Sequence, residues 1–227
     1  MSKHRPLFAK RLAKRYLRPG DAVLEIGAAD GVYTQIYANA VGSTGSVMAV
    51  EPHRGFFDVL SILQMAQPWI SLCDSAVGAS NGSATLNTDA EKPKCSSLYG
   101  GNVPTLGETY PIQMTTVDTL VKGMKPKPRL IQVDAQGAEA AIIQGASKTL
   151  RLPIIWILEL WNDGLAQAGA SVGDVLHPFK KQGYTIHNIR TRATNYQAVY
   201  QDAERRHGGS FLDVLLLPRN LDMREAA

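Results

Sequence analysis

Short apolar runs alternate with amphipathic stretches along most of the chain, which predicts strands alternating with helices. A short apolar run between turn residues is typical of a buried strand, whereas apolar residues three and four apart indicate one face of a helix. We expect strands at 22–26, 46–50, 69–77, 129–133, 154–160, 184–189 and 211–217. We expect helices at 3–18, 32–41, 56–67, 138–150 and 172–182.

Segment 78–128 interrupts this alternation. It is rich in Gly, Ser, Asn, Thr and Pro, and its two alternating stretches, 83–88 and 112–117, predict a hairpin or edge strands. Between them, residues 100–104 (Gly-Gly-Asn-Val-Pro) predict a mobile loop. The whole pattern predicts a doubly wound α/β fold with a mainly parallel sheet. We expect one domain over 21–220 that contains this insertion, preceded by a basic amphipathic helix at 1–20 and followed by a tail at 221–227.

Composition and charge narrow the class of protein. The 227 residues are 44% apolar and 19% charged, which is ordinary for a folded domain. Seven of the 24 Lys and Arg side chains lie in residues 1–20, which leaves 17 basic against 20 acidic groups in the remainder. That balance does not favour a nucleic-acid binder. The basic helix is expected to pack its leucines on the domain, and contact with acidic lipid or with an anionic substrate stays open.

The two cysteines, Cys73 and Cys95, are too few for a disulfide framework and have no zinc-type spacing. No apolar run approaches the 18 residues of a membrane span, and the N-terminus lacks the apolar core of a secretory signal. We therefore expect a cytoplasmic protein. The sequence does not indicate an oligomeric state.

The strongest chemical signal is the turn after the first strand. Strand 22–26 leads into Gly27-Ala28-Ala29-Asp30-Gly31 and then a helix, so small residues let a ligand approach the backbone. Ala29 breaks the G-x-G-x-x-G spacing of a dinucleotide site. Glu25 and Asp30 would repel a pyrophosphate and suit a cationic ammonium or sulfonium group. An ordinary tight turn is the alternative interpretation.

The next two strands end in polar residues. Glu51, followed by Pro52, comes about 20 residues after the Gly-rich turn, where an acid can accept hydrogen bonds from ribose hydroxyls. Asp74 and Ser75 follow the third strand. They would meet an adenine edge, or Asp74 would cap a turn.

These motifs, with others downstream, resemble the FkbM family of class I methyltransferases. The resemblance covers residues 20–217 and is carried by Glu51-Pro52, Ser75-Ala76-Val77-Gly78 with Gly82, Thr116-Val117-Asp118-Thr119-Leu120, Leu130-Ile131-Gln132-Val133-Asp134-Ala135-Gln136-Gly137-Ala138-Glu139, Gly145-Ala146 and Ile157-Leu158-Glu159-Leu160. It implies a seven-stranded sheet with the last strand antiparallel. It also implies S-adenosylmethionine as cofactor, S-adenosylhomocysteine as product, and methyl transfer, commonly to a hydroxyl oxygen.

The resemblance also assigns site residues. The methionine part of the cofactor would be surrounded by residues of the first motif, namely Glu25, Gly27, Ala28, Asp30, Gly31, Tyr33 and Thr34. Glu51 and Pro52 would hold the ribose, Asp74, Ser75 and Ala76 would flank adenine, and Asp134 would face the amino-acid end or the methyl-transfer site. Gln136 stands where the family usually has Glu, so a charge-dependent role of that position, including metal binding, is open.

A hydroxyl acceptor must lose its proton, which calls for a base beside the cofactor. Asp134 and Glu159 end strands expected to be neighbours, so we expect this pair as the catalytic, acidic floor of the acceptor site. Glu159 would otherwise cap or pair with a neighbour, and Glu139 is expected to compensate a helix dipole.

The sequence therefore predicts an S-adenosylmethionine-dependent O-methyltransferase that acts on a small molecule or a glycan. Three alternatives remain: a non-catalytic nucleoside-binding protein, an RNA methyltransferase and a nicotinamide-dependent dehydrogenase. The acceptor and any divalent metal are not specified.

Overall fold

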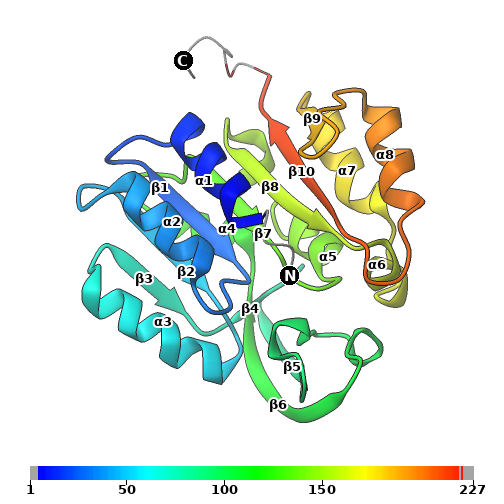
Figure 1. Cartoon of the computed structure of the whole chain (residues 1–227), viewed down its shortest axis with the longest axis horizontal. Helices are drawn as coiled ribbons and strands as arrows, with labels where there is room; N and C mark the ends of the chain where they lie inside the picture. The colour runs from blue at the N-terminus through cyan, green and yellow to red at the C-terminus, as the bar shows by residue number, and fades with distance from the viewer. Residues whose placement is uncertain (1–4, 220, 222–227) are drawn as a thin grey trace.

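The computed structural model describes residues 5–219 and 221, and its centre is a seven-stranded sheet (Figure 1). The strands lie in the order β3-β2-β1-β7-β8-β10-β9. Only β10 is antiparallel to its neighbours. Their bounds are β1 (Ala22–Ile26), β2 (Ser46–Val50), β3 (Ile70–Cys73), β7 (Leu130–Val133), β8 (Ile155–Leu160), β9 (Thr185–Asn188) and β10 (Leu212–Leu217). The predicted doubly wound fold is confirmed.

Helices cover both faces of this sheet because successive side chains of a buried strand point to opposite sides. Val23 packs with α1 (Arg5–Tyr16) and α2 (Val32–Val41), whereas Leu24 packs with α5 (Glu139–Gln144) and α7 (Val172–Lys181). In Figure 1, α1 and α2 lie in front of the sheet, and α5 and α7 lie behind it. The remaining helices are α3 (Arg54–Ala66), α4 (Val117–Gly123), α6 (Asn162–Gln167), α8 (Tyr196–Glu204) and the 3-10 turn η3 (Thr149–Arg151).

Segment 78–128 contributes most of a second, three-stranded sheet, seen at the bottom of Figure 1. Its order is β4-β6-β5, with β5 and β6 forming the expected antiparallel hairpin. The elements are β4 (Ala76–Val77), β5 (Gly82–Asp89), β6 (Leu106–Thr115) and two 3-10 turns in the connection, η1 (Pro93–Cys95) and η2 (Gly100–Asn102).

The basic helix α1 packs on the domain, but only in part through the expected leucines, because Leu7 is 57% exposed. Ala9, Ala13 and Tyr16 are buried against the α2 face, whereas Lys10 and Lys14 are exposed. Residues 1–4 of the predicted helix and 222–227 of the predicted tail lie outside the described residues.

The single strand predicted at 69–77 is wrong. The chain leaves the main sheet after Cys73, bends at Asp74 and Ser75, and pairs again as β4, where Ala76 is opposite Met114 of β6. A continuous apolar pattern does not reveal that its two halves belong to different sheets.

The helix predicted at 138–150 was also too long, and α4, α6 and α8 were not predicted. Helix α5 ends at Gln144, and Gly145 then lies against the backbone of Gly78, where a Cβ would come 2.2 Å from the carbonyl oxygen. Helices α4 and α8 each begin after a side-chain cap, Thr116 and Asn195 respectively. Those caps were the sequence signals that could have revealed both helices.

The expected mobile loop at 100–104 instead contains η2, and its Asn102 is 2% exposed. The Asn102 side-chain amide donates to the carbonyl oxygens of Gln136 and Gly164, at 3.0 and 3.1 Å. The segment is therefore attached to the end of β7, where the site lies.

Candidate active site

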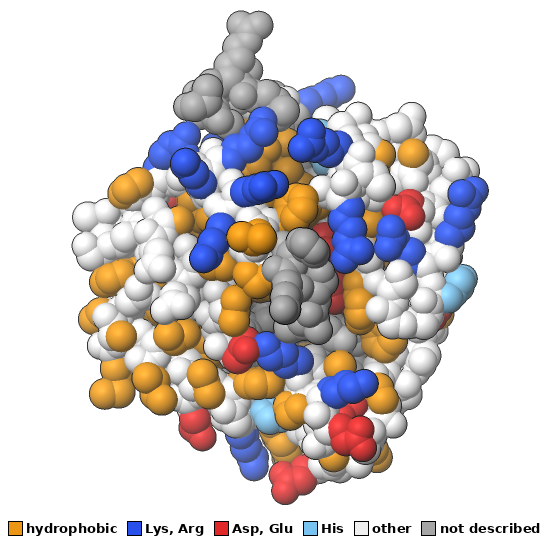
Figure 2. All heavy atoms as spheres, viewed as in Figure 1, with side chains coloured by type: hydrophobic (Ala, Val, Ile, Leu, Met, Phe, Trp, Pro, Cys, Tyr) orange, Lys and Arg blue, Asp and Glu red, His pale blue; other side chains and the backbone are white. Residues whose placement is uncertain are grey.

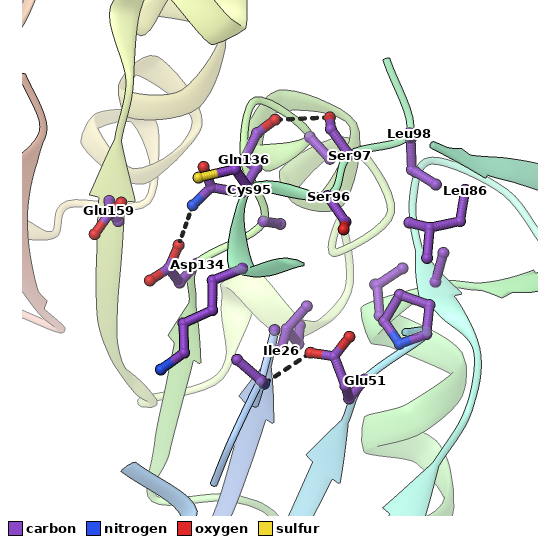
Figure 3. Close-up of a pocket in the computed structure, with 18 of the residues that line it drawn as sticks. Ile26, Glu51, Leu86, Cys95, Ser96, Ser97, Leu98, Asp134, Gln136 and Glu159 are labelled. Carbon is purple, nitrogen blue, oxygen red and sulfur yellow. Dashed lines mark hydrogen bonds between the residues drawn. The ribbon is translucent and has the colours of Figure 1, made fainter. Parts of the chain in front are cut away.

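A cavity of about 1050 Å³ lies at the carboxyl ends of β1, β2, β7 and β8 (Figure 3). Parallel α/β sheets bind ligands at this edge. Six of the predicted cofactor residues line it, together with the predicted catalytic Glu159: Gly27, Glu51, Pro52, Ser75, Ala76 and Asp134. The structure thus brings predicted site residues from the ends of separate strands together around one cavity.

The turn after β1 lies against the end of β7. Gly27 has φ +83°, and a Cβ there would come 1.9 Å from the Asp134 carbonyl oxygen. Ala29 also takes a left-handed conformation, with φ +46°. Only a residue without a side chain fits at position 27. The turn can therefore lie directly against the end of β7, and no side chain from position 27 fills the cavity.

Glu51 connects the Gly-rich turn to β2. Its carboxylate accepts hydrogen bonds from the backbone N–H groups of Ala29 and His53, at 2.7 and 2.8 Å. The side chain is 6% exposed, and burial raises the pKa of Glu51 to about 7. Each oxygen has a second lone pair that can accept from a ligand hydroxyl on the cavity side.

Glu25 lies behind the turn rather than in the cavity. It is fully buried and accepts a hydrogen bond of 2.6 Å from the Thr34 hydroxyl. Burial raises its pKa to about 8. Its Oε1 atom is buried without a hydrogen bond from any described residue. Glu25 and Thr34 therefore lie behind the cavity wall, where they would not contact a ligand directly.

Other predicted cofactor residues also lie outside the cavity lining. Ala28 and Gly31 are buried in the turn, and Tyr33 lines a separate cavity beneath α1. Asp74 is exposed and lines a third cavity, with Arg54 and Tyr110. None of these four residues is among the described residues that line the main cavity.

Asp30 reaches the cavity through an ion pair that the sequence did not indicate. Its carboxylate lies 2.5 Å from the ammonium of Lys94, which lines the cavity. Lys94 belongs to η1, within residues 92–98, all of which line the cavity. We call residues 92–98 the strap, because they cross from the second sheet to the Gly-rich turn.

Asp134 and Glu159 lie side by side at the ends of the neighbouring strands β7 and β8. β7 and β8 pair in parallel with Val133 opposite Leu158, so Asp134 and Glu159 occupy the next register position on one face. Glu159 is 5% exposed, and both side chains line the cavity. Two acidic side chains therefore lie side by side in the cavity lining, and their catalytic role stays a prediction.

Gln136 contacts this floor directly. Its side-chain amide donates to Asp134 Oδ1 at 3.0 Å, and its backbone takes φ +49° (Figure 3). The Gln136 carbonyl oxygen accepts from Ser97 of the strap at 2.9 Å and from Asn102. A strained backbone held from two sides thus aims the amide at Asp134.

Residues around the floor fill structural roles or complete the rim. Glu139 is 1% exposed and accepts from the backbone N–H groups of Ala135 and Gly137, so it organises the turn after β7 as well as the start of α5. Trp161 donates to the Gly208 carbonyl and does not line the cavity. The segment after α8 adds further lining residues, namely His207, Gly209, Ser210 and Phe211.

The profile of the family described as "Methyltransferase FkbM domain" matches residues 25–186. The chain belongs to the FkbM methyltransferase family. This confirms the family predicted from the sequence and, with it, the cofactor class, S-adenosylmethionine. A search of curated protein sequences found no match.

Solved structures with the same fold are distant in sequence. A candidate rRNA methylase of Clostridium thermocellum has a TM-score of 0.56 at 11% identity, over 96% of this chain and 97% of that one. The candidate methyltransferase SMU.1697c of Streptococcus mutans, in complex with S-adenosylhomocysteine, has a TM-score of 0.53 at 10% identity, covering 96% and 99%. The O-methyltransferase TM0748 of Thermotoga maritima has 0.51 at 10% identity, covering 96% and 65%. These similarities support the class I methyltransferase fold.

Within residues 5–219, no three His, Cys, Asp or Glu side chains are grouped so as to hold a metal ion. Over the same residues, none of the helices combines the length and apolar character needed to cross a bilayer.

Proposed function

We propose that this FkbM-family protein is an S-adenosylmethionine-dependent O-methyltransferase of a small hydroxylated molecule. The observation that carries the proposal is the pair Asp134 and Glu159 on the floor of the cavity, with the Gln136 amide bonded to Asp134 at 3.0 Å. An amide N–H donates only to an acceptor, so this contact favours the carboxylate form of Asp134, the form that can remove a proton.

The residues present fit the cofactor. Glu51 offers carboxylate lone pairs to ribose hydroxyls, and the apolar end of the cavity, with Phe56, Ala76 and Leu86, suits a purine. The ion pair of Asp30 and Lys94 suits a zwitterionic amino acid, with the carboxylate of Asp30 for the ammonium and the ammonium of Lys94 for the carboxylate. Buried Glu25 adds negative potential beneath the turn when ionised.

The bound cofactor would supply a methyl group that the sulfonium already activates. The protein then has two tasks, alignment and deprotonation. Asp134 would take the proton of the acceptor hydroxyl, with the Gln136 amide fixing the direction of its other oxygen. Glu159, beside it on β8, would share the hydrogen bond of that hydroxyl before the transfer and so orient it, and the proton then goes to Asp134.

Three alternatives are less well supported. A nicotinamide dehydrogenase would need a pyrophosphate on the Gly-rich turn, where Ala29 breaks the required glycine spacing and the carboxylate of Asp30 would repel it. The acidic balance of residues 21–227 disfavours RNA. A non-catalytic nucleoside-binding protein would not need Asp134 and Glu159 side by side.

We also propose a cytoplasmic location, because the two cysteines are unbonded.

Calorimetric titration with S-adenosylmethionine, S-adenosylhomocysteine and NAD tests the cofactor. We expect micromolar binding of the first two and none of NAD. Glu51→Ala should weaken S-adenosylhomocysteine binding by at least ~1 kcal/mol, because it removes hydrogen bonds to a charged group. Glu108→Ala, an exposed acid of β6, is the control. Binding of NAD alone, or an unchanged affinity in folded Glu51→Ala, would overturn the assignment.

A further inference from the structure

A second cavity, of about 380 Å³, lies beneath α1 on the face of the sheet that carries the active-site acids. Its volume is within the usual range of small-molecule sites. The residues that line it come from α1, α2, the sheet and the turn after β9: Leu7, Phe8, Ala9, Arg11, Leu12, Tyr33, Tyr37, Gln132, Ile157, Ile189, Arg190 and Asp213. Nothing in the proposed cofactor site uses this space.

The floor of this cavity continues the floor of the active site. On β7, Gln132 precedes Asp134 by two residues, and on β8, Ile157 precedes Glu159 by two, so each pair points to the same face about 7 Å apart. Asp213 of β10 is the register partner of Glu159. The two cavities therefore adjoin along three neighbouring strands.

Arg190 connects them at the rim, because it lines both. The turn that carries it is fixed by Asn188, which is 1% exposed and accepts from the backbone N–H groups of Arg190 and Thr191 at 2.8 and 3.0 Å. The Asn188 amide in turn donates to Asp202 of α8 at 2.7 Å. Buried hydrogen bonds thus set the position of the arginine backbone.

The roof is a mixed apolar and basic side of α1. Leu7 and Arg11, and likewise Phe8 and Leu12, are four residues apart, so all four project from one side of the helix. The neighbouring stripe, with Ala9 and Ala13, packs α1 onto the domain. The helix therefore combines an anchoring stripe with a stripe that faces the cavity.

The second cavity is lined by charged as well as apolar side chains. Arg11 and Arg190 both line it, and neither guanidinium has a hydrogen bond or ion pair with another described residue. Asp213 is the one acid among the described lining residues. Figure 2 shows Lys and Arg side chains gathered on this face of the molecule.

We propose that the second cavity binds the body of the methyl acceptor, and that the acceptor is a hydroxylated compound with an apolar body and an oxyanion. Arg11 and Arg190 would hold the oxyanion, since guanidinium matches carboxylate, sulfate and phosphate geometry. Leu12, Tyr33 and Ile157 would contact the apolar body, which leaves a hydroxyl to reach Asp134. The inference rests on the proposed O-methyl transfer, and it favours an amphiphilic small molecule over a glycan.

Two fluorescent probes with one aromatic skeleton test this class. 8-Anilinonaphthalene-1-sulfonate carries the oxyanion, and N-phenyl-1-naphthylamine lacks it. We expect the full-length protein to bind the sulfonate more tightly. Arg11→Ala and Arg190→Ala should each weaken sulfonate binding about tenfold and leave the neutral probe unchanged. Lys14→Ala removes an equal charge from an exposed position of α1 outside the cavity, and it should change neither affinity.

Competition with decanoate and decyl phosphate then identifies the preferred oxyanion. Equal affinities for the two fluorescent probes, or an equal loss in Arg11→Ala and Lys14→Ala, would overturn the proposal. If Arg11→Ala also loses the neutral probe, the helix is damaged and Arg190→Ala decides: unchanged sulfonate binding in Arg190→Ala would then overturn the proposal.

Titration with S-adenosylhomocysteine keeps this proposal separate from the proposed function. An Arg11-dependent preference for the sulfonate without S-adenosylhomocysteine binding would uphold the anion site and overturn the proposed cofactor. Binding of S-adenosylhomocysteine without that preference would overturn the anion site alone.

Discussion

Gln136 contributes to the active site through both its side chain and its backbone. The side-chain amide donates to Asp134, while the carbonyl oxygen accepts from Ser97 and Asn102. A glutamate, which the family usually has here, would place a second negative charge beside Asp134 instead of a donor. The residue that departs from the family pattern is therefore the one whose side chain contacts the candidate base.

Gln136→Glu tests this effect directly. The new carboxylate should make Asp134 harder to ionise, because like charges in contact disfavour the charged form. We expect the carboxyl carbon of Asp134, followed by NMR, to titrate at higher pH in the variant than in the natural protein. Gln113→Glu, on the exposed side of β6, is the control. Titration of Asp134 at the same pH in all three proteins would contradict the role of Gln136.

Lys94 allows a second test at the residue scale. If its ammonium holds the carboxylate of the cofactor, Lys94→Met should weaken S-adenosylhomocysteine binding about tenfold, the cost of one charged hydrogen bond. Binding of 5′-methylthioadenosine, which has no amino-acid group, should not change. Calorimetry measures both affinities, and Lys181→Met, at an exposed position of α7, is the control. An equal loss for both ligands would show that Lys94 only supports the strap.

At the scale of elements, the strap and η2 connect the second sheet to the site. Ser97 and Asn102 bond to Gln136, Lys94 pairs with Asp30, and Asn87 of β5 exchanges backbone hydrogen bonds with Ser97. The insertion is therefore not peripheral, because it covers the cavity and holds the turn after β7.

Asn102→Ala tests the contribution of that attachment to stability. The variant loses two hydrogen bonds and leaves the Gln136 and Gly164 carbonyls without this donor. We expect the free energy of unfolding in urea to fall by about 1–3 kcal/mol. The exposed substitution Gln197→Ala should change it by less than about 0.5 kcal/mol. Equal stability of the two variants would show that η2 does not support the fold.

At the scale of the whole molecule, three acids buried in and around the site have raised pKa values. Burial raises the pKa of Glu25 to about 8 and the pKa values of Glu51 and Glu139 to about 7. In the unfolded chain these groups ionise near pH 4.5. Between that pH and about 7–8 the folded state binds more protons, so their contribution to stability decreases as pH rises.

Thermal unfolding without cofactor should show this pH dependence. We expect the unfolding midpoint to decrease from pH 6 to pH 8.5, and to decrease less in Glu25→Gln, whose amide cannot ionise. Asp58→Asn, an exposed acid of α3, should keep the slope of the natural protein. A Glu25→Gln slope as steep as that of the natural protein would mean that Glu25 is already ionised when folded.

The sequence by itself determined the alternation of the main-sheet strands with α1, α2, α3, α5 and α7, the Gly-rich turn, and the acids at the strand ends, because these depend on local periodicity and on residue type. It also indicated the family. Only the tertiary structure decided that β4 leaves the main sheet, that Lys94 meets Asp30, that Gln136 bonds to Asp134, and that α1 roofs a second cavity beside Glu159. Each of these depends on contacts between residues distant in the chain, and a local pattern carries no information about them.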